Sequence, residues 1–514
     1  MPMKRTEFIF TVAIISFILL IRAIPFIEHG FSLSIDSAGV VRDAYVFTER
    51  SPISLFSGEF DGYNNFWPGA SISASIFSLS SGLNILISAS LFPIISFIDF
   101  ILILSAISAS LYRKHSTLTI ALVVGTTTSM ILMSIGLVKE GVAYPLFGTA
   151  LYAVLKEKGD NMSYFIALLS SSALAITHHL TTLVLIVSLW AIFSWSLISL
   201  LQYRPIDPLR FSILLAISLL PAFLQYFFLG RLSTLSVASF YLGASLVTWT
   251  TLFSLLTVIL YSSFEKSEKL LRFFKPAAFT AIPLSILSVY LSNDLGFFGE
   301  EWTWYAISLS FSLLFLASAL SYSQNIEGMI PWLLFSAVGS IMIFTIYENI
   351  PIKVDLLGRL STFLIIPLAI ALVAGLGKNE KKVIFLLVLC YSIIMLFTFF
   401  SVQLGIAESP GGFWTFSESE LTSGQQLRNI GLQCVSTDVK MSYLFNSFLG
   451  IRTSTWNLTT GGNILISVYM TERGMLLDTG KTLRIGDQIL AKLSSSSSLV
   501  YSNGGVSLFV GKTS

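Results

Sequence analysis

Charged residues are scarce in this chain of 514 residues, because Asp, Glu, Lys and Arg make up only 11% of it. Soluble domains carry about 25% charged residues, so the chain lacks the polar surface that water requires. The near balance of 30 basic and 28 acidic residues gives no indication of a nucleic-acid partner. The two cysteines, Cys390 and Cys434, fall in different segments, so we expect neither a disulfide nor a cysteine metal site.

Apolar residues are abundant, at 54% of the chain, and they fall in long blocks. Many blocks reach ~20 residues, which is the length of a helix that crosses ~30 Å of hydrocarbon. No small-residue cleavage site precedes Arg22, so the first block is interpreted as a retained span rather than a signal peptide. The sequence predicts a polytopic α-helical membrane protein with thirteen spans, near residues 7–24, 84–111, 117–136, 141–155, 162–177, 180–201, 208–229, 236–262, 275–292, 302–322, 327–347, 359–377 and 381–403.

The distribution of positive charge predicts the orientation of these spans. With a cytoplasmic N-terminus, fifteen of the thirty Lys and Arg residues lie in cytoplasmic segments and seven in the extracytoplasmic loops. The odd number of spans then places the C-terminus outside. A Ser-rich stretch at 67–82, which opens with Trp67 and Pro68, is interpreted as a half-inserted or re-entrant helix, because counting it as a full span would move Arg113 and Lys114 outside.

Two domains are expected from this pattern. Residues 1–403 form the transmembrane domain, with a long first extracytoplasmic loop at 25–66, and residues 404–514 form a small extracytoplasmic α/β domain. Strand-like runs such as 464–470 support the second domain. Residues 499–510 predict a β-hairpin whose turn is Asn503-Gly504, because both residues tolerate positive φ.

The first loop contains the candidate acid residues Asp36 and Asp43, close to Arg42. An Asp beside the membrane can bind a divalent cation or accept a proton from an acceptor hydroxyl. The alternative is a solvated loop in which Arg42 pairs with Asp36 or Asp43. Asp36 is the residue that we expect to be catalytic.

Further candidates lie at the predicted outer ends of later spans. Glu140 would be on the same side as Asp36, so the two carboxylates could converge on one site or on a metal ion, although Glu140 could also form an interfacial pair with Lys139. His178 and His179 share an outside turn and either cap a helix end or lie near a phosphate or an acceptor.

Arg359 and Lys353 are the outside cations of the late spans. The planar guanidinium of Arg359 suits phosphate oxygens. Asp99 falls in the middle of a span, where it has either a structural role or a part in a proton relay.

The order and the side of these residues resemble the GT-C class of membrane glycosyltransferases. That class includes the dolichyl-phosphate-mannose protein mannosyltransferases and the archaeal-type oligosaccharyltransferase subunits. The resemblance rests on an early Asp in a large outside loop, an aromatic-Pro segment, a Lys-Glu-x-x-x-Tyr-Pro pattern, the His pair, a late Arg-x-x-x-Phe-x-x-x-Pro pattern and a closing hairpin: Asp36, Trp67-Pro68, Lys139 to Pro145, His178-His179, Arg359 to Pro367 and 499–510.

The resemblance implies transfer of a sugar from a polyprenyl-phosphate donor to a glycan or protein acceptor on the extracytoplasmic face. Asp36 would then be the general base, and Arg359 with Lys353 or a histidine would stabilise the leaving phosphate. The tail has no Trp-Trp-Asp-Tyr-Gly motif, so we expect no N-oligosaccharyl transfer. Asp36 is followed by Ser37 instead of a second acid, which leaves the need for a divalent cation open.

Two other functions remain open from the sequence. A transporter or flippase of a lipid-linked solute would need broken helices in matching halves and ionisable residues at mid-membrane. A non-catalytic GT-C-like subunit would keep the architecture without the chemistry. The sequence leaves the sugar, the acceptor and the oligomeric state open.

Overall fold

The computed structural model describes most of the chain, and the residues named below come from that part. The described ranges are 5–49, 64–112, 117–156, 161–201, 208–228, 240–266, 302–321, 326–347, 353–375, 381–403, 415–456, 462–472, 475–476, 482–483 and 485–511. The chain divides into two compact units. The first contains Met1–Arg22, Ile94–Ser134 and Glu140–Pro410, and the second contains Ala23–Pro93, Ile135–Lys139 and Gly411–Ser514.

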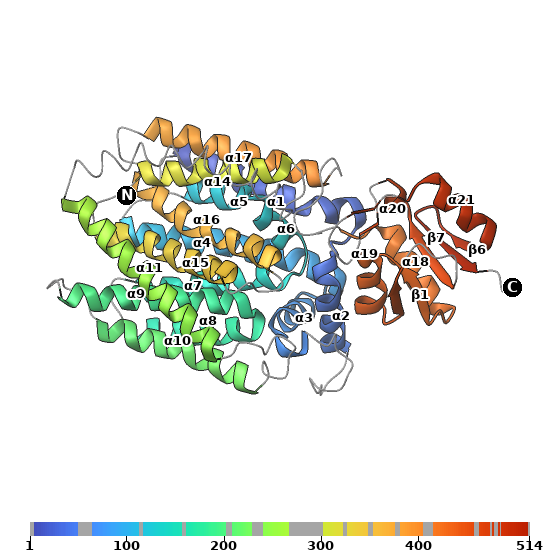
Figure 1. Ribbon diagram of the computed structural model, residues 1–514, viewed down its shortest axis with the longest axis horizontal. Helices are drawn as coiled ribbons and strands as arrows, with labels where there is room; N and C mark the ends of the chain where they lie inside the picture. The colour runs from blue at the N-terminus through green and yellow to red at the C-terminus, as the bar shows by residue number, and fades with distance from the viewer. Residues whose placement is uncertain are drawn as a thin grey trace. The chain divides into compact units, whose positions relative to one another are not determined.

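The first unit is built from long apolar helices. Its described helices are α5 (Thr117–Thr126), α6 (Thr128–Ile135), α7 (Lys139–Leu155), α8 (Asn161–Thr177), α9 (His179–Leu201), α10 (Pro208–Phe228), α11 (Phe240–Lys266), α14 (Trp302–Leu320), α15 (Ile326–Tyr347), α16 (Lys353–Gly375) and α17 (Lys381–Gln403), with parts of α1 (Arg5–His29) and α4 (Ile85–Tyr112). Helix α16 packs against α15, α14 and α5, and α17 packs against α14 and α5 (Figure 1).

Seven described helices are long and apolar enough to cross a membrane, or eight if α5 and α6 form one span bent by 77°. Their length and composition indicate a membrane protein. Twelve of the thirteen predicted windows coincide with described helices, and the window 275–292 lies outside the described residues. The count of thirteen spans is therefore not confirmed. One predicted span, 117–136, is broken where Thr127 separates α5 from α6.

The second unit contains α2 (Ile35–Glu49), which lies in the predicted first loop, a 3-10 turn at Asn64–Phe66, and α3 (Gly69–Ser81), which is the helix of the Ser-rich stretch 67–82. Small residues let α2 and α3 approach closely. Ser71 donates from Oγ to the carbonyl of Val40 at 2.9 Å, and Ser75 donates to the carbonyl of Ala44 at 2.9 Å. Helix α3 ends at Gly82, whose φ of 72° places it in the left-handed region.

Most of the rest of the second unit is the C-terminal segment, which contains helices and strands as expected. A five-stranded sheet has the order β2-β1-β3-β7-β6, in which β1 is parallel to β2 and β3, whereas β7 is antiparallel to β3 and β6. The elements are β1 (Cys434–Thr437), β2 (Arg452–Thr455), β3 (Asn463–Ser467), β4 (Met475–Leu476), β5 (Thr482–Leu483), β6 (Ser497–Ser502), β7 (Val506–Gly511), α18 (Glu418–Asn429), α19 (Val439–Ser442), a π-helical turn at Tyr443–Phe448, α20 (Val468–Glu472) and α21 (Asp487–Ser496).

The predicted hairpin is confirmed. Strands β6 and β7 pair antiparallel around a turn in which the Asn503 side chain accepts hydrogen bonds from the backbone N–H groups of Gly505 and Val506. Gly504 has a φ of 86°, which a residue with a side chain rarely adopts. The turn residues therefore set the hairpin as the sequence indicated.

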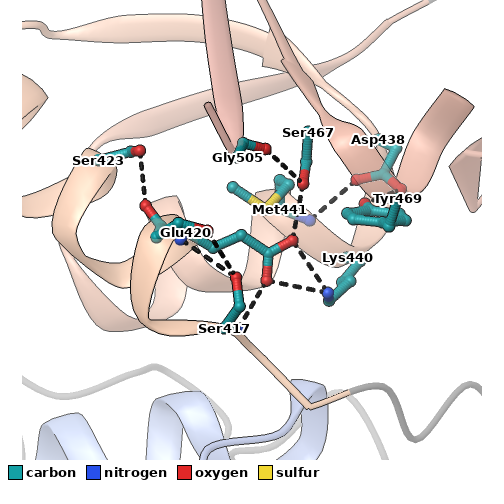
Figure 2. A network of polar contacts seen from close by, with 10 residues as sticks. Ser417, Glu420, Ser423, Asp438, Lys440, Met441, Ser467, Tyr469 and Gly505 are labelled. Atoms are coloured by element: carbon teal, nitrogen blue, oxygen red, sulfur yellow. Dashed lines mark hydrogen bonds and ion pairs between the residues drawn. The ribbon is translucent and has the colours of Figure 1, made fainter. Parts of the chain in front are cut away.

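A buried polar network joins α18, α19 and the sheet (Figure 2). The Glu420 carboxylate accepts two hydrogen bonds from Lys440 Nζ, at 3.1 and 3.0 Å, and one from Ser467 Oγ at 2.8 Å. It also accepts from the backbone N–H of Ser417 at 2.9 Å, which completes the capping box of α18. Helix α18 is thereby tied to α19 and β3.

The same network contains a second carboxylate, Asp438, which caps α19 through the backbone N–H of Met441 at 2.9 Å. The hydroxyl of Tyr469 donates to the other oxygen of Asp438. Burial, with the negative charges of Asp438 and Glu420, raises the pKa of Tyr469 well above its usual value. Both carboxylates of the network, Glu420 and Asp438, therefore accept hydrogen bonds from side chains and from backbone N–H groups.

Candidate functional site

Glu140 lies in the first turn of α7, where the exposed N–H groups of the helix favour a carboxylate. Its side chain is only 1% exposed. The next residue, Gly141, contacts the bent span, because a Cβ at this position would lie 2.3 Å from the carbonyl oxygen of Met133 in α6. Glycine therefore lets α6 and the start of α7 approach closely, and this fixes where Glu140 lies.

An arginine and a histidine from distant parts of the sequence lie close to the same oxygen of Glu140. Arg359 Nη1 of α16 lies 3.5 Å from Glu140 Oε1, and His178 Nε2 lies 3.7 Å from it. His178 is buried at the junction of α8 and α9, whereas the Arg359 side chain is 25% exposed. The first unit thus brings together three of the residues that the sequence analysis selected: Glu140, His178 and Arg359.

The hydrogen bonds of His178 assign its neutral tautomer. The backbone N–H of Thr181 donates to His178 Nδ1 at 3.3 Å, and Thr181 Oγ1 lies 2.7 Å from the same nitrogen. Because Nδ1 is an acceptor, the proton of the neutral ring is on Nε2, which faces Glu140. His179 differs from its neighbour. It is exposed, and its ring centroid lies 5.1 Å from that of His178.

An aromatic layer lies one helical turn further along α7 and α16. Tyr144 follows Glu140 by four residues and Phe363 follows Arg359 by four, so each pair shares a helix face. The rings of Tyr144 and Phe363 are 5.8 Å apart in an edge-on arrangement. Phe100 of α4 stacks on Tyr144 at 5.3 Å, and Phe147 of α7 contacts Phe363 at 6.0 Å. The charged cluster therefore borders an apolar, aromatic surface.

Arg22 is a buried cation that the sequence analysis treated only as the end of the first span. It is fully buried, and its guanidinium donates to Ser134 Oγ at 2.7 Å and to the carbonyl of Gly125 at 3.0 Å, while it covers the ring of Phe97 at 3.7 Å. These contacts bridge the break between α5 and α6. The signal in the sequence was an arginine within an otherwise apolar helix, which is costly in a membrane unless it has a use.

Asp36 belongs to the second unit, where it lies half-buried in the first turn of α2. The turn that precedes it packs against residues 135–139, because Ser32 Oγ donates to the carbonyl of Ile135 at 2.6 Å. A Cβ on Gly136 would lie 3.3 Å from the carbonyl oxygen of Ser32. These contacts fix the turn before α2 against residues 135–139 of the same unit.

The C-terminal segment also contacts α2 and the turn before it, within the same unit. The backbone N–H of Phe416 donates to the carbonyl of Leu33 at 2.8 Å. Arg42 donates to the carbonyl of Ser447 at 3.4 Å, and the rings of Tyr45 and Phe448 are 6.2 Å apart. Helix α2, which carries Asp36, is therefore fixed partly by residues more than 380 positions away in sequence.

The remaining candidates have the following positions. Asp43 is buried on α2, and Lys353 begins α16, but the side chain of Lys353 lies outside the described residues. Asp99 lies in the middle of α4 on an exposed face, next to the exposed side chains of Ile95 and Leu102. This position does not fit a proton relay through the interior of the bundle.

The sequence leaves open a divalent cation bound by Asp36 and Glu140. Among the described residues, no group of three or more His, Cys, Asp or Glu side chains is arranged to hold a metal ion. Glu140 faces the guanidinium of Arg359, whose fixed positive charge disfavours a metal ion at the same carboxylate oxygen. The metal role of Asp36 stays a prediction.

Comparison with known proteins gives the fold. The structure is similar to the crystal structure of the apo oligosaccharyltransferase from Archaeoglobus fulgidus, with a TM-score of 0.50 and 8% sequence identity over 90% of this chain and 70% of that one. The fold is that of the GT-C glycosyltransferases. The resemblance predicted from the sequence is therefore confirmed at the level of the fold.

Two other similar structures belong to the same class. The arabinofuranosyltransferase AftD from Mycobacteria has a TM-score of 0.49 at 9% identity, and this chain spans 40% of its length. ArnT from Cupriavidus metallidurans, bound to undecaprenyl phosphate, has a TM-score of 0.38 at 11% identity over 98% of each chain. No family model and no curated protein matches the sequence.

Proposed function

We propose that this chain is a membrane glycosyltransferase that moves a sugar from a polyprenyl-phosphate donor to a glycan or protein acceptor. The observation that carries the proposal is the buried cluster of Glu140, His178 and Arg359 within a helical bundle of the GT-C fold. Ionisable side chains are costly within a membrane protein, so such a cluster indicates a use. The GT-C fold makes glycosyl transfer the reaction that fits best.

The cluster suits the phosphate side of this reaction. Arg359 is a quarter exposed, and its contact with Glu140 is longer than a hydrogen bond, so a phosphate oxygen can approach the guanidinium. The buried aromatic layer of Tyr144, Phe363 and Phe100 places apolar rings next to that cation. A polyprenyl phosphate combines the same two properties, an anionic head and an apolar chain.

The reaction needs a base on the acceptor side. The acceptor hydroxyl oxygen bonds to the anomeric carbon while the bond from that carbon to the phosphate oxygen breaks. The hydroxyl proton passes to the base, which we assign to Asp36, and polyprenyl phosphate leaves with its negative charge stabilised by Arg359. The half-buried place of Asp36 on a helix fixed at several points is consistent with this role.

A transporter or flippase is not favoured. That function would need ionisable residues facing a path through the middle of the membrane, and the mid-span Asp99 lies on an exposed face of α4 instead. A non-catalytic subunit would show no glycan phenotype in the experiment below.

The proposal is tested by placing Asp36→Asn and Arg359→Gln separately in the native host, followed by profiling of lipid-linked and protein-linked glycans. Both variants should accumulate one polyprenyl-phosphate sugar and lose one glycan product. Asp487→Asn and Arg428→Gln, which change exposed residues of the C-terminal segment in the same way, should leave the profile unchanged. An unchanged profile in both site variants, expressed at the wild-type level, would contradict the proposal.

A further inference from the structure

Tyr144 carries a buried hydroxyl for which the described residues supply no partner. The side chain is fully buried on α7, and its oxygen makes no hydrogen bond with any described residue. Burying an unpaired hydroxyl is unfavourable, and native proteins rarely leave one without reason. Tyr391, the other fully buried large tyrosine of the described helices, is different, because its hydroxyl lies 2.6 Å from Thr127 Oγ1.

Thr362 repeats this pattern on α16. Most buried Ser and Thr hydroxyls in the helices donate to a carbonyl of their own helix, as Thr398 does to Ile394 at 2.9 Å. Ser361, next to Thr362, donates in this way to Gly358 at 2.6 Å. The Thr362 hydroxyl is 1% exposed and makes no hydrogen bond with any described residue, so it is not turned back onto its own helix.

Both residues lie about one helical turn from a member of the charged cluster on the same helix. Tyr144 is one turn beyond Glu140 on α7, and Thr362 is on the turn of α16 that follows Arg359. Helices α7 and α16 contact each other at these two successive turns, first through Glu140 and Arg359 and then through the rings of Tyr144 and Phe363. Tyr144 and Thr362 therefore lie at the turns of α7 and α16 where the charged cluster meets the aromatic layer.

We propose that the hydroxyls of Tyr144 and Thr362 form an inner subsite that donates hydrogen bonds to the phosphate of a polyprenyl phosphate bound at Arg359. A hydroxyl can donate to a phosphate oxygen, and a bond to a charged acceptor is stronger than one to a neutral group. The adjacent rings of Phe100 and Phe363 would contact the first isoprene unit. This inference rests on the proposed function and names the residues that select the lipid phosphate.

The subsite predicts an unusual combination of effects for Tyr144→Phe. The variant removes a hydroxyl that has no partner in the described part of the chain, so the ligand-free protein should be as stable as the wild type or more so. It should bind undecaprenyl phosphate about tenfold more weakly, because a bond to a charged group is lost. Thr362→Val should behave in the same way. A purely structural hydroxyl would give the opposite result, with lower stability and unchanged affinity.

The experiment measures radiolabelled undecaprenyl phosphate binding and the melting temperature for the full-length chain in nanodiscs. Undecaprenol, which lacks the phosphate, should bind equally to wild type and Tyr144→Phe. Excess phosphatidic acid and inorganic phosphate serve as competitors and should displace the probe poorly. Tyr391→Phe and Thr398→Val are the matched controls, since each removes a hydroxyl that has a partner. They should lower the melting temperature and leave the affinity unchanged.

The outcomes separate the subsite from the proposed function. If the wild type binds undecaprenyl phosphate no better than undecaprenol, the lipid-phosphate donor and the subsite both fail. If the wild type prefers the phosphate and Tyr144→Phe and Thr362→Val bind it equally well, only the subsite is overturned. A lower melting temperature for ligand-free Tyr144→Phe, or its failure to fold, would also overturn the subsite, because the hydroxyl would then have a structural partner. Displacement of the probe by phosphatidic acid or by inorganic phosphate would show that the site binds phosphate groups in general, and would overturn its selectivity for a polyprenyl phosphate.

Discussion

The two buried carboxylates of Glu420 and Glu140 have contrasting surroundings. Glu420, in the C-terminal segment, accepts hydrogen bonds from Lys440, Ser467 and Ser417 at 2.8–3.1 Å (Figure 2). Glu140, in the helical bundle, has ion pairs with Arg359 and His178 at 3.5 and 3.7 Å. Both carboxylates are almost fully buried.

This difference in contacts indicates a structural role for the Glu420 network and a ligand-binding role for the Glu140 cluster. A buried ion pair is tolerated when further hydrogen bonds satisfy its charges, and the Glu420 pair meets that condition. Around Glu140 the contacts are longer, and the nearby hydroxyls of Tyr144 and Thr362 have no partner among the described residues. A network of short hydrogen bonds fixes a fold, whereas buried hydroxyls without a partner in the described part of the chain are suited to a ligand.

The largest effect on stability is expected in the Glu420 network. Lys440→Met leaves the Glu420 carboxylate buried without its counter-ion, and such a loss costs about 3–5 kcal/mol. Pulse proteolysis of the full-length chain in nanodiscs should show early cleavage of the C-terminal segment. Adding Glu420→Gln to Lys440→Met should recover part of the loss, since no uncompensated charge then remains. Wild-type resistance of the single variant would contradict a structural role for the pair.

A smaller loss is expected where α6 meets α7. In Gly141→Ala the new methyl group would lie 2.3 Å from the carbonyl oxygen of Met133, so the start of α7 must shift. Such overpacking costs about 1–3 kcal/mol and should also displace Glu140. The measurement is the melting temperature, together with the glycan profile. Gly339→Ala on α15 is the control, because nothing lies within 4 Å of its added Cβ, and it should match or exceed the wild type.

The smallest effect on stability is expected at Glu140 itself. Arg359 is a quarter exposed, so water can hydrate it when Glu140→Gln removes the carboxylate charge. We expect a change in the free energy of unfolding of less than about 1 kcal/mol, with loss of the same glycan that Arg359→Gln removes. A loss of stability as large as that of Lys440→Met would show that the two clusters have the same role.

The sequence predicted the features that depend on local pattern. Twelve of the predicted apolar blocks coincide with described helices, and Asn503-Gly504 gave the hairpin turn, because both follow from residues close in sequence. The cluster of Glu140, His178 and Arg359 was selected from charge at span ends alone, without its contacts.

Features that depend on distant contacts were not predicted. The role of Arg22 at the break between α5 and α6 requires Ser134 and Gly125, which are more than 100 positions away. The exposed face of Asp99 and the unpaired hydroxyl of Tyr144 likewise depend on how the helices pack. Hydropathy cannot distinguish these cases, because it assigns the same value to a residue whatever its neighbours are.

The most direct test of the account is the affinity of wild type and Arg359→Gln for undecaprenyl phosphate, measured on the full-length chain in nanodiscs. If Arg359 binds the donor phosphate, its loss should weaken binding about a hundredfold, as expected when a charge-assisted phosphate contact is removed. Arg428→Gln should bind like the wild type. Equal affinity of wild type and Arg359→Gln would contradict the assignment of this cluster to the donor phosphate.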